Sequence, residues 1–114
     1  MIITKTEPFT KEEIKKLSEQ FHGVYIKTVI DLQRKVCSAG ASLHVDNEAI
    51  LIKDGSEQKD VWGGGIDIET KTIDDISMIN TRGGVNPSQE ILDEETRSKY
   101  EELTKYFFKE LWTN

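Results

Sequence analysis

The sequence has few of the residues that mark disulfide-bonded, secreted or membrane proteins. Cys37 is the single cysteine among 114 residues, so an internal disulfide is excluded. No apolar run approaches the roughly 18 residues that a membrane-spanning helix needs, and the charged N-terminus does not resemble a secretory signal. The two histidines, His22 and His44, occur without a catalytic Ser/His/Asp order or Cys/His signature. We therefore expect a cytoplasmic protein without a membrane partner, and the sequence specifies no reaction.

Length and charge narrow the fold and its partners. A chain of 114 residues is long enough for one domain and too short for two that each bury a good core. Charged residues make up 32% of the chain, above the usual quarter, and the net charge is −6 at pH 7. A negative protein repels phosphate backbones, which argues against a nucleic-acid partner. We expect one domain, residues 1–114, with a densely charged surface.

Helical patterns are predicted in both terminal parts of the chain. Thr10-Lys11-Glu12-Glu13 has the sequence of a capping box, followed by apolar residues at helical spacing. A second helical stripe is predicted from Val24 to Cys37, with Cys37 buried and Gly40 as the left-handed stop. Asp93 is predicted to cap a helix that runs to about Leu111. These patterns place helices within residues 11–39 and over residues 94–111.

Strands are predicted for the central part. Residues 42–45 and 49–52 are short apolar runs separated by polar residues, which predicts a hairpin over 43–53. Residues 61–68, around three consecutive glycines, predict a bent strand, and residues 76–82 a last strand. This order predicts an α+β fold: an antiparallel sheet of three to four strands packed on N-terminal helices and a C-terminal helix. The residues expected to be buried are Val29, Val36, Leu43, Ile50, Ile52, Ile79, Leu103 and Phe107.

The predicted hairpin carries a set of polar residues spaced by two. His44, Asp46 and Glu48 would point to one face of an extended strand. One histidine and two carboxylates can ligate a divalent metal such as zinc or manganese, or serve as a general acid/base set. Alternatively, the two acids satisfy backbone groups of a turn and His44 packs at a strand edge.

The last predicted strand places Asn80 and Arg82 on one face. Arginine offers a planar fork for a carboxylate or phosphate ligand, or for an internal ion pair. We expect Arg82 to lie within reach of a carboxylate among Asp46, Glu48, Asp54 and Asp60. Together, the polar residues of the central part define a predicted ligand-binding or catalytic pocket: His44, Asp46, Glu48, Asp54, Gln58, Asp60, Trp62, Asn80 and Arg82.

An ordered series of these residues resembles the motif of an uncharacterised prokaryotic family. The series runs Gly40, His44, Asp46, Glu48, Leu51, Asp54-Gly55-Ser56, Gln58, Asp60, Trp62-Gly63, Asn80, Arg82, Asn86, Ser88, Ile91 and Asp93. In this order the chain resembles the small proteins known as domain of unknown function 5674. The family usually has one proline a few residues after the Trp-Gly pair and another directly after the arginine. In this chain residues 66–69 contain no proline, and Gly83 follows Arg82. The resemblance implies a shared fold and brings no activity.

Three kinds of function remain open from the sequence. The first is a pocket for a small molecule, catalytic or not, with a divalent metal as a possible cofactor. The second is an interaction module that binds a protein, or a homodimer, whose polar residues hold its sheet together. The third is a toxin-like ribonuclease with helices followed by a sheet, against which the negative charge argues.

Overall fold

Strands and helices alternate along the chain in the computed structural model, which describes residues 1–113. The strands are β1 (Ile3–Lys5), β2 (Tyr25–Asp31), β3 (Val36–Ala39), β4 (Val61–Asp67) and β5 (Thr72–Asp74). The α-helices are α1 (Lys11–Ser18), α2 (His44–Lys53) and α3 (Glu94–Phe107). Short 3₁₀ helices are η1 (Gln58–Asp60), η2 (Met78–Asn80) and η3 (Lys109–Trp112).

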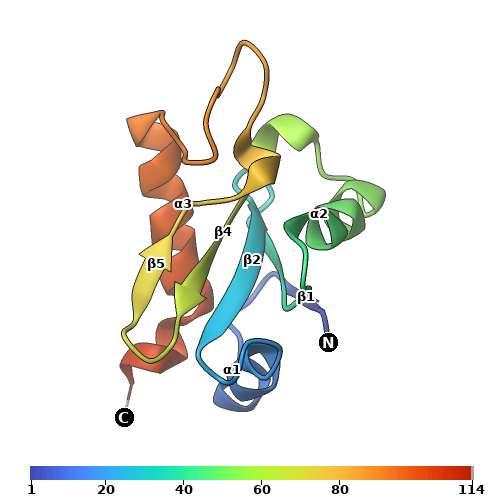
Figure 1. The fold of residues 1–114 in the computed structure, drawn as a ribbon. Coiled ribbons are helices and arrows are strands. Elements are labelled where there is room, and N and C mark those ends of the chain that lie inside the picture. The colour runs from blue at the N-terminus through green and yellow to red at the C-terminus, as the bar shows by residue number, and fades with distance from the viewer. Residues whose placement is uncertain (114) are drawn as a thin grey trace.

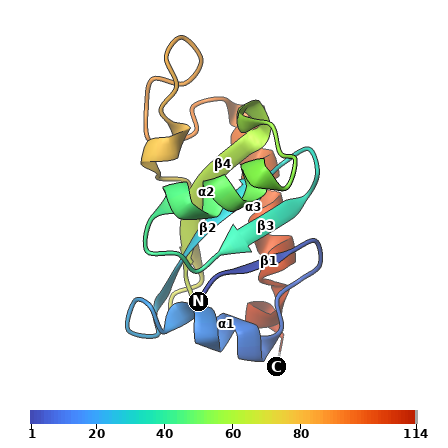
Figure 2. The same cartoon turned by 90° about the vertical axis from the view of Figure 1, so that its right-hand side faces the viewer.

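The five strands form one antiparallel sheet in the order β1-β3-β2-β4-β5. Strands β2 and β4 form its centre and pair from Tyr25↔Asp67 to Asp31↔Val61. Helix α3 crosses one face of the sheet, and α2 lies on the opposite face (Figure 1 and Figure 2). The α+β class predicted from the sequence is confirmed, with five strands in place of three to four.

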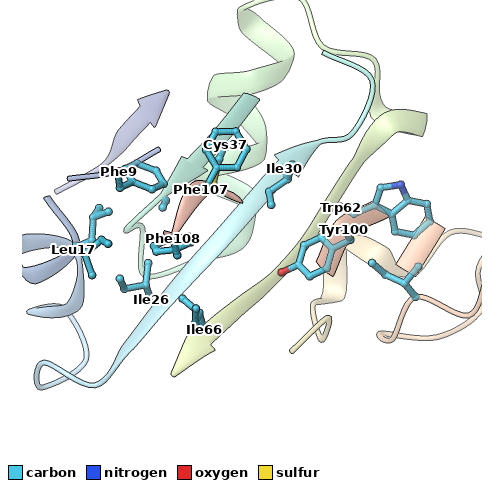
Figure 3. Close-up of a cluster of buried hydrophobic side chains, with 13 residues drawn as sticks. Phe9, Leu17, Ile26, Ile30, Cys37, Trp62, Ile66, Tyr100, Phe107 and Phe108 are labelled. Carbon is cyan, nitrogen blue, oxygen red and sulfur yellow. The ribbon is translucent and has the colours of Figure 1, made fainter. Parts of the chain in front are cut away.

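The larger core cluster lies between the sheet and helices α1 and α3. Phe9 packs on Phe108 with ring centroids 5.0 Å apart, and Leu17 and Trp62 lie at opposite ends of the cluster (Figure 3). The buried Tyr100 hydroxyl bonds to Thr28 at 3.1 Å and donates to a β5 carbonyl at 3.0 Å. This face therefore joins both ends of the chain to the centre of the sheet.

A smaller cluster lies under α2 on the other face. It contains Val29, Val36, Leu51 and Val61, with Ile79 packed against it. The predictions that Val29, Val36 and Phe107 are buried are confirmed, and Ile79 and Leu103 are partly buried. The predictions for Leu43, Ile50 and Ile52 are wrong, because Ile50 and Ile52 lie on the solvent side of α2 and Leu43, its N-cap, is exposed.

The predicted second helix, over 24–37, is wrong. These residues form the hairpin of β2 and β3, and the Asp31 carboxylate accepts the Gln33 and Arg34 amides in its turn, both at 2.9 Å. Strand β2 is buried on both faces over most of its length, so its sequence lacks the alternation of a half-exposed strand. A run of this kind cannot be distinguished from a buried helix by periodicity alone.

The predicted hairpin over 43–53 is also wrong, because these residues form α2. His44, Asn47 and Leu51 follow at helical spacing, and Asn47 and Leu51 are fully buried. Asn47 fixes the helix to the sheet: its amide donates to Ser38 Oγ at 2.9 Å, and its oxygen accepts the Ala41 amide. The exposed valine and isoleucines of this segment gave it the composition of a strand.

The predicted strand over 76–82 is replaced by a loop that contains η2, while the strand itself, β5, lies earlier. Strand β4 contains the three glycines as predicted, and a Cβ on Gly64 would collide with the Tyr100 hydroxyl. The capping box at Thr10 and the cap at Asp93 are both formed. Helix α3 ends at Phe107 and continues as η3, close to the predicted end.

Candidate functional site

The nine residues predicted for a pocket do not line one pocket. The helix that replaces the predicted hairpin separates the metal candidates, because residues two apart on a helix point in different directions. Asp46 is exposed, Glu48 is half-buried and His44 faces the sheet. Residues 1–113 contain no group of three or more His, Cys, Asp or Glu side chains arranged to hold a metal ion. The extended strand on which the metal hypothesis depended is therefore absent from the described residues.

The Asn80 side chain forms hydrogen bonds with the sheet. Strand β5 pairs only with the end of β4, from Gly65 onward, so the first half of that β4 edge needs other partners. The Asn80 side chain supplies them, since its oxygen accepts the Gly63 amide and its amide donates to the Gly63 carbonyl, both at 2.9 Å. The same amide reaches the carbonyls of Asp75 and Gln89 at 2.9 and 3.0 Å. One fully buried side chain thus holds the β4 edge and the following loop together.

Arg82 also bonds to groups along this β4 edge, and we call the covering of the edge by Asn80 and Arg82 its closure. Its guanidinium donates to the Lys59 carbonyl at 3.3 Å and to the Val61 carbonyl, and it stacks 4.0 Å from the Trp62 ring centroid. The expected ion pair is not formed: the ion pairs within residues 1–113 involve other cations. Burial lowers the pKa of Arg82, while the charges of Glu48 and Asp60 act in the opposite direction. Carbonyl oxygens have taken the place of the expected carboxylate.

The remaining predicted residues are divided among three places. Asp54 pairs with Arg34 at 3.1 Å beside the turn that ends α2, and Arg34 also donates to Ser56 at 2.9 Å. Gln58 is exposed on η1. Asp60 and Trp62 line a small polar hollow of about 230 Å³ next to the start of α3. Of the nine residues, only His44 lines the apolar cleft between α2 and η2.

Two adjoining hollows form this cleft between the start of α2 and the segment that joins β5 to η2. One, of about 380 Å³, is lined by Lys27, Leu43, His44, Val45, Ser77, Met78 and Ile79. The other, of about 510 Å³, is lined by Tyr25, Lys27, His44, Asp74, Ile76, Ser77, Met78 and Gln89. Because they share four residues, we treat them as one site and call it the His44 cleft. Its size is in the range of about 300–1,000 Å³ typical of ligand sites.

His44 forms part of the floor of this cleft. Its Nε2 lies 2.6 Å from the Gly64 carbonyl oxygen. A carbonyl only accepts, so Nε2 carries the proton and Nδ1 of the neutral ring is left as an acceptor. Burial lowers the pKa of His44 and Lys27 adds to this effect, while the Gly64 bond and Asp74 oppose it. The imidazole is therefore neutral near pH 7, with its tautomer fixed by β4.

Two further polar groups have fixed positions in the His44 cleft. At one end, the Tyr25 hydroxyl donates to Asp74 Oδ2 at 2.7 Å, and burial raises the pKa of Tyr25. Near the start of α2, Lys27 Nζ donates to the Ser42 carbonyl at 2.8 Å and lies 5.5 Å from the centroid of the Phe21 ring. The cleft thus has a cation at one position and a hydrogen-bonded carboxylate at another.

The rim of the His44 cleft is apolar. Met78 is 78% exposed and Leu43 57% exposed, and Val45 and Ile76 are exposed to a similar degree as Leu43. Sequence analysis missed this rim and the polar residues Tyr25, Lys27 and Asp74. The rim was assigned to buried strands. The cleft joins residues that are 15 positions apart, as for Lys27 and Ser42, to 49 positions apart, as for Tyr25 and Asp74, and a single sequence does not reveal such contacts.

Another apolar hollow, of about 460 Å³, lies between α1 and η3. The polar side chains around it include Lys11, Lys15 and Glu19, which are exposed on the surface of α1 or beside it. Within residues 1–113 these three side chains form no hydrogen bond, whereas those of His44 and Tyr25 are each held by one. The His44 cleft is therefore the better candidate for a binding site.

The fold and the cleft define a small α+β protein with one antiparallel sheet and an apolar, polar-floored cleft. The chain belongs to the family described as "Protein of unknown function (DUF5674)", whose model matches residues 1–107. No curated protein and no solved structure matches the chain. Among residues 1–113, no helix has the length and apolar character required to cross a membrane.

Proposed function

We propose that this protein is a non-catalytic binding protein and that the His44 cleft receives an apolar small molecule. The observation that carries this proposal is the apolar rim, in which Leu43, Val45, Ile76 and Met78 remain exposed around a floor of oriented polar groups. Ligand sites combine such apolar walls with a few fixed polar groups that orient the ligand. Covering this exposed apolar rim with a ligand lowers the free energy by about 25 cal/mol for each Å² of apolar surface that is removed from water.

Binding without catalysis is supported by the hydrogen bonds of the polar groups. Ser77 and His44 both line the cleft, but Ser77 Oγ accepts the Ile79 amide and His44 Nε2 is bonded to Gly64. Among the described residues, no hydrogen bond links Ser77, His44 and Asp74 in the nucleophile–base–orienter order that covalent catalysis by a serine uses. The helix-then-sheet order that suggested a ribonuclease is also not found, since helices and strands alternate.

Octan-1-ol is a suitable neutral probe, and ¹⁵N-labelled protein can be titrated with it by NMR. We expect amide shifts at residues 43–45 and 76–79 with a dissociation constant of about millimolar, as its few atoms allow. Met78→Ser should weaken binding about tenfold, because it removes apolar contact area. Val85→Ser is the matched control, since Val85 is 74% exposed and lies outside the cleft.

Two results would contradict this proposal. One is an absence of shifts around the cleft at saturating octan-1-ol. The other is equal weakening by Met78→Ser and Val85→Ser, which would indicate non-specific contact with exposed apolar side chains. Shifts of the same amides with protein concentration alone would instead indicate that a second copy covers this surface.

A further inference from the structure

The carboxylate of the His44 cleft is already satisfied within the protein. Asp74 Oδ2 accepts the Tyr25 hydroxyl at 2.7 Å, and Asp74 Oδ1 accepts the Ile76 amide at 3.0 Å. Both carboxylate oxygens therefore hold a donor from the chain itself. These bonds fix the position of the carboxylate, and a cationic ligand would have to reach the lone pairs that they leave free.

Within residues 1–113, the cation of the cleft has no carboxylate partner. Lys27 Nζ is held by the neutral Ser42 carbonyl and by the face of Phe21, and none of the ion pairs in the described part of the chain includes it. It lines both hollows of the cleft from the central strand β2 and is half-buried. An ammonium that is held in place with no carboxylate beside it can pair with an anionic ligand.

The surroundings of Lys27 add to this attraction. Ser42, which fixes its ammonium, lies two residues before the start of α2. The N-cap of α2 is Leu43, which forms no side-chain cap within residues 1–113, so the positive end of the helix faces the same region. This dipole reinforces the charge of Lys27 and does not replace it.

We propose that the ligand of the His44 cleft is an apolar monocarboxylate, with its carboxylate at Lys27 and its chain along Leu43, Val45 and Met78. The inference rests on the proposed function and specifies the ligand class. One negative charge matches the one free cation that the described residues place in the cleft, whereas Asp74 and the net charge of −6 disfavour a more highly charged anion. The exposed rim requires an apolar chain, so a small hydrophilic acid such as acetate does not fit.

The test compares three eight-carbon probes that differ in their head group: octanoate, octan-1-ol and octylammonium. Each is titrated into the full-length protein at pH 7.4 and low salt, with binding followed by amide shifts. We expect octanoate to bind at least fivefold more tightly than octan-1-ol, and octylammonium to bind most weakly. Hexanoate should bind about tenfold more weakly than octanoate, because it lacks two methylenes.

Variants then assign the head-group preference to one side chain. Lys27→Gln should weaken octanoate binding and so remove the advantage of octanoate over octan-1-ol. Lys53→Gln is the matched control, since Lys53 is an exposed lysine at the far end of α2. The comparison of probes on the unaltered protein tests the inference even if Lys27→Gln folds poorly.

The outcomes separate this inference from the proposed function. If octan-1-ol binds at the cleft and octanoate binds no more tightly, the monocarboxylate inference is overturned and the binding function stands. The monocarboxylate inference is likewise overturned if Lys27→Gln folds and leaves octanoate affinity unchanged. If neither octanoate nor octan-1-ol shifts the cleft amides, both are overturned.

Discussion

Replacement of Asn80 by alanine tests whether a single side chain closes the edge of β4. Asn80 is fully buried, and its oxygen is the acceptor for the Gly63 amide. Its two amide hydrogens serve the carbonyls of Gly63, Asp75 and Gln89, so at least one of these bonds is shared. Asn80→Ala leaves a buried N–H without a partner and removes a donor from three carbonyls.

The expected loss of stability is large for a single substitution. A buried donor or acceptor left unsatisfied costs about 1–3 kcal/mol, and several groups are affected, so we expect the free energy of unfolding to fall by about 3–5 kcal/mol. This is a substantial part of the roughly 5–15 kcal/mol that stabilises a small domain. Urea unfolding followed by tryptophan fluorescence measures the change. Thr81→Ala, at the exposed neighbouring residue, is the control and should change stability by less than about 0.5 kcal/mol.

Asn80→Asp adds a test based on pH. The aspartate keeps one acceptor for Gly63 but directs its second oxygen at carbonyl oxygens, so burial and repulsion raise the pKa of the introduced carboxyl above its unfolded value. Stability should then be highest at low pH and be lost as pH rises through the folded pKa. Relative to Asn80→Ala, the aspartate variant should therefore gain stability as pH falls from 7 to 5. A loss below about 1 kcal/mol for Asn80→Ala, or a pH-independent difference between the two variants, would refute the proposed closure.

Three further predictions concern the core, the sheet and the cleft. Leu51→Ala should lower the free energy of unfolding by about 2–5 kcal/mol, whereas Leu43→Ala should change it by less than about 0.5 kcal/mol. Equal effects in urea unfolding would contradict the burial of Leu51 under α2 and the exposure of Leu43. Gly64→Ala should prevent folding or lower the melting temperature far more than Gly63→Ala. At position 64 the added methyl group meets a buried hydroxyl and a backbone carbonyl, whereas at position 63 it meets only side chains. The pKa of His44 is lowered in the folded state, so the unfolded state binds a proton first as pH falls below about 6.5, and the free energy of unfolding should fall as the pH does. His44→Gln should show a smaller fall in stability between pH 7 and 5. Identical pH profiles for the two proteins would contradict a neutral buried imidazole.

The parts of the fold that the sequence predicted correctly have local signals. The Thr10 capping box and the Asp93 cap depend on residues three or four positions apart, and both are formed. The three glycines lie in a strand, β4, as expected, and Tyr100 and Tyr25 occupy the space that a Cβ on Gly64 or Gly65 would need. In each case the interaction that fixes the backbone is contained in a short sequence or requires a residue without a side chain.

The errors arise where tertiary contacts decide the structure. Strand β2 is covered on both faces, which removed the alternation that distinguishes a strand. Helix α2 exposes Ile50 and Ile52, whose branched side chains favoured a strand. Asn80 and Arg82 were identified as notable residues, but their partners are backbone groups of β4, which no sequence pattern identifies. Sequence therefore found important positions without revealing their roles.

The closure of β4 has a consequence for how this protein behaves at high concentration. An unpaired strand edge offers its amides and carbonyls to a strand of another molecule and is a starting point for edge-to-edge aggregation. Here Asn80 and Arg82 already occupy groups along the first half of the β4 edge, and they are carried by a loop that extends away from the sheet (Figure 1). The same two side chains that fix the loop thereby deny this edge to a neighbouring chain.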